Sequence, residues 1–184
     1  MSEMNRIVVI GSSGSGKTTF ARKIAAILDL PHLEMDAVFH KYGFADEAHD
    51  EFLPTLKDFT SGDRWVVDGD YTSHGTGEVV WPRADTIIWL DPPRGLAMSR
   101  VVRRTLRRVI LREELWPGVK EPFSNLYSLD PHQNIMVWTW TRHHQVREKY
   151  ETAMTEGSWD HVTVRRLRSA GEVRAFLDSI TSTE

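Results

Sequence analysis

Eight residues near the amino terminus have the types and spacing needed to hold a chain of phosphates. The run Gly11-Ser12-Ser13-Gly14-Ser15-Gly16-Lys17-Thr18 matches the pattern G-x-x-x-x-G-K-[ST] in full. Its glycines let the backbone curl so that N–H groups converge on phosphate oxygens. Lys17 supplies a charge for the terminal phosphates, and Thr18 supplies a hydroxyl for Mg²⁺. We therefore expect this loop, extended by Thr19, to bind a nucleotide.

Three aspartates, Asp36, Asp68 and Asp91, each follow an apolar segment that reads as a strand. In an open α/β sheet, ligands bind beyond the carboxyl ends of the strands, so we expect all three at the edge that carries the phosphate loop. Asp68, followed by Gly69, is predicted to hold Mg²⁺ through water, because Mg²⁺ gives up its water reluctantly. Turn formation or helix capping is the alternative role for each aspartate, and Pro92-Pro93 favours it at Asp91.

Seven arginines and no acidic residue occur between residues 94 and 112, namely Arg94, Arg100, Arg103, Arg104, Arg107, Arg108 and Arg112. Val102, Leu106 and Val109 recur at helical spacing, which predicts an amphipathic helix with a cationic face. A solvated face and a nucleic-acid-binding face are two interpretations. The favoured third interpretation is a helix that closes over nucleotide phosphates and neutralises charge on the transferred group.

The elements that must position these residues alternate between apolar runs and helical patterns, which is typical of an α/β chain with a parallel sheet. We expect strands near residues 6–10, 32–35, 65–67, 86–90 and 162–167, a loop at 119–130, and helices near 17–28, 46–60, 94–115, 131–154 and 171–180. In the predicted helix at 131–154, Trp138, Trp140 and Tyr150 are expected to pack in the core.

Length and composition fit a single domain over residues 1–184. The net charge is −3, there is no cysteine, and no apolar run approaches the length of a membrane span. A cytoplasmic protein without a membrane partner is therefore expected, and the sequence implies no particular oligomeric state.

The phosphate loop resembles that of P-loop NTPases, and the chain resembles the adenylate-kinase-like small kinases. More specifically, it is similar to the topology modulation protein (FlaR-like) family over about residues 5–180. The segments that carry the likeness are the loop, Leu33-Glu34-Met35-Asp36-Ala37, and residues 65–71, 84–91 and 100–104. The resemblance implies a three-layer P-loop NTPase fold with a five-stranded parallel sheet, an acceptor-side region at 36–63 and a helical lid region at 94–155.

The resemblance also implies roles for individual residues. ATP and Mg²⁺ would be the cofactors, and the catalytic residues would be Lys17, Asp36, Arg100 and Arg104. Asp36 would contact the hydroxyl of the acceptor and take its proton. Arg104 and Arg168 would also bind the nucleotide, Arg168 by stacking on adenine. A purely structural turn is the equal alternative for Arg168.

The acceptor side departs from nucleoside monophosphate kinases, which surround their acceptor phosphate with arginines. Between Ala37 and Asp63 there is no arginine, and two lysines, Lys41 and Lys57, face six acidic residues. This field predicts a weakly charged hydroxyl acceptor, such as a small molecule or a nucleoside, although Arg83 is near enough in sequence to reach the site. The expected partners are thus a nucleotide and a small-molecule acceptor, with nucleic acid less favoured. The alternative function is an ATP-binding regulatory or DNA-associated protein with little kinase activity.

Overall fold

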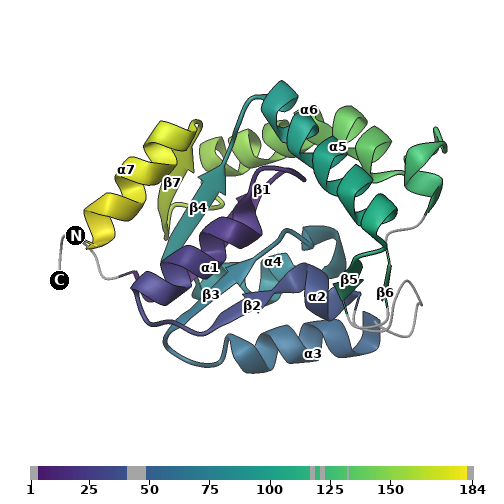
Figure 1. The fold of residues 1–184 in the computed structure, drawn as a ribbon. Helices are drawn as coiled ribbons and strands as arrows, with labels where there is room; N and C mark the ends of the chain where they lie inside the picture. Colours follow the sequence, from purple (N-terminus) through teal and green to yellow (C-terminus); the bar gives the residue numbers. More distant parts are fainter. Residues whose placement is uncertain (1–3, 41–48, 117–118, 121–122, 132, 182–184) are drawn as a thin grey trace.

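A parallel sheet of five strands forms the centre of the computed structural model, which describes residues 4–40, 49–116, 119–120, 123–131 and 133–181 (Figure 1). The strand order is β2-β3-β1-β4-β7, and every neighbouring pair in this sheet is parallel. The bounds are β1 Arg6–Gly11, β2 His32–Glu34, β3 Trp65–Asp68, β4 Thr86–Leu90 and β7 Thr163–Leu167. The predicted five-stranded parallel sheet is therefore confirmed.

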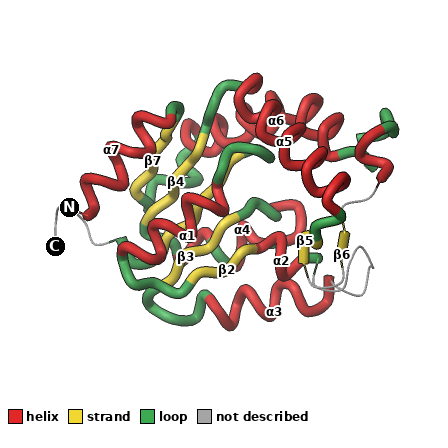
Figure 2. Tube along the Cα trace, in the orientation of Figure 1, coloured by secondary structure: helices red, strands yellow, loops and turns green. Residues whose placement is uncertain are grey.

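Helices cover both faces of the sheet, as the tube in Figure 2 shows. The α-helices are α1 Lys17–Ile27, α2 Met35–Phe39, α3 His49–Phe59, α4 Thr76–Val79, α5 Arg94–Leu111, α6 Ile135–Thr155 and α7 Ala170–Thr181. Short 3₁₀ helices are η2 Thr72–His74, η3 Trp81–Arg83 and η4 Phe123–Leu126. Two further strands, β5 Glu114–Trp116 and β6 Val119–Lys120, form a small antiparallel pair.

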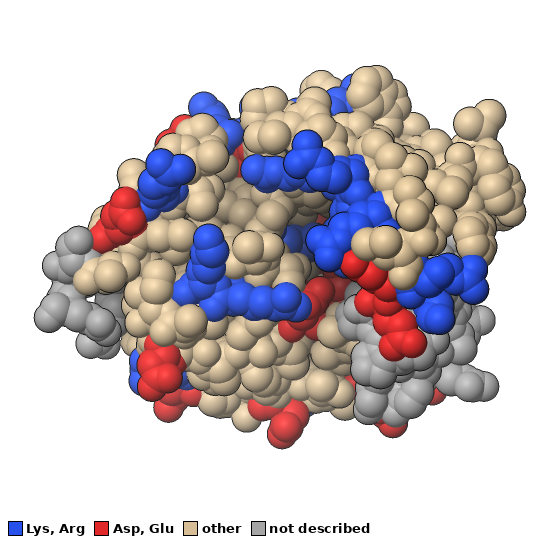
Figure 3. Space-filling model, in the orientation of Figure 1, with Lys and Arg blue, Asp and Glu red and all other residues tan. Residues whose placement is uncertain are grey.

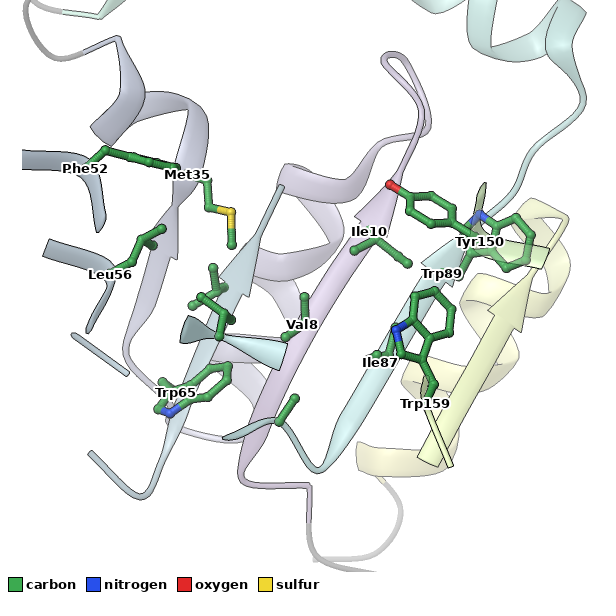
Figure 4. Close-up of a cluster of buried hydrophobic side chains, with 13 residues drawn as sticks. Val8, Ile10, Met35, Phe52, Leu56, Trp65, Ile87, Trp89, Tyr150 and Trp159 are labelled. Carbon is green, nitrogen blue, oxygen red and sulfur yellow. The ribbon is translucent and has the colours of Figure 1, made fainter. Parts of the chain in front are cut away.

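Alternate residues of the strands enter two separate hydrophobic layers, as the period of two in a strand requires. Ile7 and Val9 of β1 pack with α1 and α7, whereas Val8 and Ile10 face the layer that includes α3 and α6. Figure 4 shows this second layer, in which Tyr150 of α6 reaches the sheet beside Trp89 of β4. Both faces of the strands are buried, which explains why they read as continuous apolar runs.

The two long helices are shorter than predicted. Helix α5 ends at Leu111 because Arg112 adopts a left-handed conformation with φ of 55°, and residues 114–116 form β5 instead of a last helical turn. Helix α6 begins at Ile135, four residues later than expected, because the side chain of Asn134 caps it. Its oxygen accepts hydrogen bonds from the backbone N–H groups of Met136 and Val137.

Of the predicted apolar stripe of α5, Val109 is buried and Leu106 is not, and the expected burial of Trp140 is wrong. The buried stripe of α5 consists of Ala97, Val101, Thr105 and Val109, while Leu106 is 41% exposed. Trp140 is not a core residue, since it is 54% exposed and carries the guanidinium of Arg94 on its ring at 3.5 Å. Tyr150, by contrast, is fully buried as expected. Within the described residues, no helix is long and apolar enough to cross a membrane.

Candidate functional site

The phosphate loop connects the carboxyl end of β1 to the first turn of α1, and its glycines are required by its surroundings. Gly14 has φ of +78°, and a Cβ there would lie 2.2 Å from the carbonyl oxygen of Ala97. A Cβ on Gly11 would lie 2.5 Å from the carbonyl oxygen of Leu90. Only glycine fits such close approaches of α5 and β4 to the loop. Lys17 opens α1, so the positive end of the helix dipole coincides with the loop.

Helix α5 lies against this loop through Arg100. Its Nη1 donates to the carbonyl oxygen of Ser15 at 3.0 Å and of Gly14 at 3.4 Å. The structure therefore brings Arg100 to the loop, as predicted, but onto the loop's carbonyl groups. Arg104, one turn later on α5, is exposed. Figure 3 shows basic side chains gathered on this face of the molecule around a hollow.

Asp68 ends β3 directly beside the start of α1 and is 1% exposed. Thr18 Oγ1 donates to its Oδ2 at 2.7 Å, and His32 Nε2 lies 2.7 Å from its Oδ1. The two residues predicted to serve a metal thus meet at the phosphate loop. A carboxylate and a hydroxyl are oxygen donors of the kind Mg²⁺ prefers. In the described part of the chain, no group of three or more histidine, cysteine or acidic side chains is arranged to hold a metal ion.

Glu34 is a further carboxyl group near Asp68 and Asp36, and the sequence analysis gave it no role. Arg22, one turn after Thr18 on α1, donates to Glu34 Oε2 at 2.8 Å. Burial raises the pKa of Glu34, and the charges of Asp68 and Asp36 raise it further against the opposing effect of Arg22. The alternation of side chains along a strand is the sequence signal that could have found Glu34 and His32. Both lie on the short strand β2, one on each side of Leu33, and therefore on the same face of the sheet. In the β2–β3 register, Glu34 pairs with Asp68 and His32 with Val66.

Asp36 lies half-buried in the first turn of α2, directly after the carboxyl end of β2. The hydroxyl of Tyr71 donates to its Oδ1 at 2.7 Å. Burial, and then the charge of Asp36, raise the pKa of Tyr71 far above its usual range, so this phenol stays a proton donor. The Tyr71 ring lies 4.5 Å from that of Phe39 and 5.8 Å from that of His74. Asp36 therefore lies beside a partly exposed cluster of aromatic side chains.

Asp70, two residues after Asp68, connects the end of β3 to α6. Lys149 Nζ lies 2.6 Å and the Tyr150 hydroxyl 2.7 Å from Asp70 Oδ2, and Thr72 also donates to this carboxylate. Burial alone would raise the pKa of Asp70, but Lys149 and the hydrogen bonds hold it below its usual value. The positive charge of Lys149 is thus engaged by a carboxylate of the chain itself.

Asp91 directly follows β4, is buried, and forms ion pairs with arginines of β7 and α6 rather than the turn or cap that Pro92-Pro93 favoured. Arg166 donates to its Oδ2 from Nε at 2.9 Å and from Nη2 at 2.6 Å, and Arg147 lies 3.5 Å away. The Arg166 guanidinium also stacks on the Trp89 ring at 3.9 Å. Sequence reasoning missed Arg166, because its partner is 75 residues away.

The remaining candidates fall at other places. Arg83 donates to the carbonyl oxygen of Ser61 at 2.8 Å, just before the strands begin, so it turns away from the phosphate-loop edge. Arg168 follows β7 and is exposed, and its backbone N–H donates to Glu172. Thr19 is exposed on the first turn of α1. Lys41 and the acidic residues at 46 and 47 lie outside the described residues.

Comparisons with known proteins agree with this geometry. No family model matches the chain. It is 33% identical over 147 residues to the cytidylate kinase of Pyrobaculum aerophilum, a stretch covering 67% of this chain and 76% of that protein. It is 32% identical to the cytidylate kinase of Pyrobaculum neutrophilum, over 68% of this chain and 77% of that one.

Two solved structures share the fold. The shikimate kinase of Acinetobacter baumannii in complex with shikimate has a TM-score of 0.60 at 16% identity, covering 98% of this chain and 92% of that one. The shikimate kinase of Bacteroides thetaiotaomicron has a TM-score of 0.55 at 14% identity, covering 98% of each chain. At these identities the likeness shows the fold, which is that of P-loop kinases.

Proposed function

The chain belongs to the family of P-loop small kinases that includes these cytidylate kinases, and from this premise we propose its reaction: transfer of the γ-phosphoryl group of Mg·ATP to a hydroxyl of a weakly charged small molecule. The observation that carries the proposal is Asp36, held by Tyr71 at the phosphate-loop edge in acidic surroundings. The relatives support membership of the small kinases in general. The finer resemblance, to topology modulation proteins, is therefore part of the proposal.

On the donor side, the backbone N–H groups of residues 11–19 and the Lys17 ammonium hold the phosphates of ATP. Thr18 and Asp68, which meet through a hydrogen bond, are the residues that would hold Mg²⁺. When bound, the ion neutralises charge on the β- and γ-phosphate oxygens. Arg100 and Arg104 extend this positive field from α5, and closure of the 94–155 region excludes water that would otherwise take the phosphoryl group. Arg168 completes the nucleotide site beside adenine.

On the acceptor side, the Asp36 carboxylate accepts the proton of the attacking hydroxyl. The acceptor oxygen forms a bond to the γ-phosphorus, the bond from that phosphorus to the bridging oxygen breaks, and ADP leaves. Tyr71 keeps Asp36 oriented through its donated hydrogen bond. Positioning and electrostatic stabilisation supply most of the rate, because the phosphoryl group needs little covalent assistance.

The charges around Asp36 support an acceptor without a phosphate group. Three basic residues that a phosphate would need are engaged elsewhere: Arg22 with Glu34, Lys149 with Asp70, and Arg83 with a backbone carbonyl. A dianionic acceptor would meet the carboxylates of Glu34 and Asp36 instead. A second candidate, a nucleoside monophosphate acceptor, is favoured by the name of the cytidylate kinase relatives.

The test is ADP formation from Mg·ATP with single additions of nucleosides, sugars, small polyols and nucleoside monophosphates, followed by identification of the phosphorylated product. We expect stimulation by one class of weakly charged hydroxyl compounds. Lys17→Ala should lose turnover by orders of magnitude, because the loop loses its only side-chain charge. Lys23→Ala, an exposed lysine on the same helix, is the matched control and should keep it.

Two outcomes would contradict the proposal. A nucleoside monophosphate as the preferred acceptor would establish the second candidate. ATP binding without turnover on any acceptor, combined with salt-sensitive retention on DNA that requires the arginines of α5, would favour the regulatory alternative.

A further inference from the structure

His32 is the residue in direct contact with the carboxylate of Asp68 that neither the phosphate-loop pattern nor the strand-end aspartates predicted. Its Nε2 lies 2.7 Å from Asp68 Oδ1, while Thr18 Oγ1 donates to Oδ2 at the same distance. An ionised carboxylate can only accept hydrogen bonds, so Nε2 carries the proton in this contact. The two contacts, one on each oxygen, fix the rotation of the carboxylate about its Cβ–Cγ bond.

The sheet register explains why His32 reaches this atom. His32 pairs with Val66 in the parallel β2–β3 ladder, and Asp68 is two residues further along β3, on the same face as Val66. Helix α1 lies over this face of the sheet (Figure 1). Thr18 therefore contacts Asp68 from the helix, and His32 contacts it from the neighbouring strand. The His32 side chain is 15% exposed and that of Asp68 is 1% exposed, so the contact is shielded from solvent.

The Thr18 contact is compatible with metal binding, because a hydroxyl can donate its proton to Asp68 and offer a lone pair to a cation at once. The carboxylate must then keep its orientation while the ion and its water shell arrive. An unfixed carboxylate would turn toward the nearest donor or leave a buried oxygen without a partner. A donor on Oδ1 from a separate element prevents this rotation.

We propose that His32 is a positioning residue, which holds the Asp68 carboxylate in the orientation in which it serves Mg²⁺. The inference rests on the proposed function, in which Asp68 belongs to the magnesium site. His32 touches neither the nucleotide nor the acceptor in this role. It acts through Asp68, as residues that hydrogen-bond metal-site carboxylates generally do.

The experiment compares the affinity for ATP, measured by calorimetry in MgCl₂ and in EDTA, so it requires no acceptor. In the wild type, Mg²⁺ should strengthen ATP binding. His32→Leu should reduce this enhancement by roughly tenfold or more, with ATP affinity in EDTA unchanged. His32→Gln should restore much of it, because its amide nitrogen occupies the place of Nε2.

Three further variants keep the result interpretable. His32→Asn carries an amide that stops short of Asp68, so it should resemble His32→Leu and replaces that variant if leucine prevents folding. His161→Leu removes a histidine that contacts the Trp81 carbonyl at the opposite edge of the sheet, and should keep the full enhancement. Asp68→Asn tests the proposed function itself and should abolish the enhancement.

The outcomes separate cleanly. Folded His32→Leu and His32→Asn proteins with wild-type Mg²⁺ enhancement would overturn the positioning role. If Asp68→Asn has lost the enhancement in that case, the magnesium site stands and the inference alone fails. If Asp68→Asn also retains it, the assignment of Asp68 to Mg²⁺ fails, and the inference fails with it.

Discussion

Asp36 and Asp68 carry the same functional group, and their surroundings give them different chemistry. Asp68 is buried and has both oxygens engaged, by Thr18 and His32, so it is suited to a fixed place beside a cation. Asp36 is half-buried, and one of its carboxylate oxygens accepts a hydrogen bond from Tyr71. Burial raises the pKa of Glu34 most, and the charges of the neighbouring Asp68 and Asp36 carboxylates raise it further.

Asp36→Asn tests the acceptor side. An amide cannot take a proton from the acceptor hydroxyl, so turnover should fall by roughly 10²- to 10⁴-fold while the affinity for Mg·ATP stays unchanged. Steady-state kinetics and calorimetry measure the two quantities. Asp58→Asn, at an exposed position on α3, is the control and should match the wild type. Wild-type turnover by Asp36→Asn would exclude Asp36 as the proton acceptor.

Glu34→Gln tests, through the thermal stability of the protein, the burial of Glu34 and its repulsion by Asp68 and Asp36. A raised carboxyl pKa means that the folded state favours the protonated form, so this contribution is fully present at low pH and is lost as pH rises through the folded pKa. Glu34→Gln should therefore unfold at a higher temperature than the wild type at pH 7 without Mg²⁺, and this advantage should shrink as pH falls through the raised pKa of folded Glu34 and be absent below pH 4.5, the ordinary value. Glu148→Gln, at an exposed site on α6, should show no such trend.

At the scale of elements, α5 is attached to the phosphate loop by its first half. Ala97 and Val101 pack on Gly14, and Arg100 donates to the loop carbonyls, while Arg103, Arg104 and Arg107 further along α5 are exposed. Any closing motion of the 94–155 region must therefore either bend α5 beyond Arg100 or move the loop with it. Arg94 strengthens the attachment by joining the start of α5 to Trp140 of α6.

Gly14→Ala tests this attachment. The new Cβ would lie 2.2 Å from the Ala97 carbonyl oxygen, in a conformation with φ of +78°, so the loop or α5 must shift. ATP binding should weaken severely and the melting temperature should fall. Gly95→Ala is the matched control, because nothing lies within 4 Å of its Cβ, and it should stabilise α5 by about 0.5–1 kcal/mol. Equal melting temperatures and ATP affinities for the two variants would contradict the close packing of α5 on the loop.

Elements with a strong local signal were predictable from the sequence. The five strands and the phosphate loop follow from apolar runs and from a complete motif, and Asp68 with Thr18 follows from the rule for strand ends. The buried stripe of α5 could not be chosen from the sequence, because α5 has apolar residues in more than one row, and packing on the distant Gly14 buries the row with Ala97 and Val101. The partners Asp91 and Arg166 are 75 residues apart, a distance at which no local pattern operates.

At the scale of the whole molecule, charge is distributed unevenly. Residues 94–112 carry seven of the positive charges, so a total of −3 leaves −10 on the rest of the chain. Ion pairs connect separate layers of the molecule: the buried Asp91 at the end of β4 meets Arg166 of β7, which also contacts the exposed Glu151 of α6. The sheet edge that carries the site is thus fixed at β7 by charge as well as by packing.

Arg166→Met tests this connection. The change keeps apolar volume over Trp89 but leaves the buried Asp91 carboxylate without its main partner, which should lower the free energy of unfolding by about 3 kcal/mol. Urea denaturation measures the loss. Arg165→Met, on the same strand but exposed, should change it by less than about 0.5 kcal/mol. Equal midpoints for the two variants would show that the pair contributes no net stability.

The central claim, phosphoryl transfer to a weakly charged hydroxyl, is tested most directly by competition between a nucleoside and its own monophosphate. The wild-type protein receives Mg·ATP with cytidine and CMP together, then with adenosine and AMP, and the products are quantified by ³¹P NMR. The account predicts that the uncharged member of a pair is phosphorylated in preference, since Glu34 and Asp36 repel a dianion while Arg22 and Lys149 are engaged. Preferential conversion of CMP to CDP would contradict it.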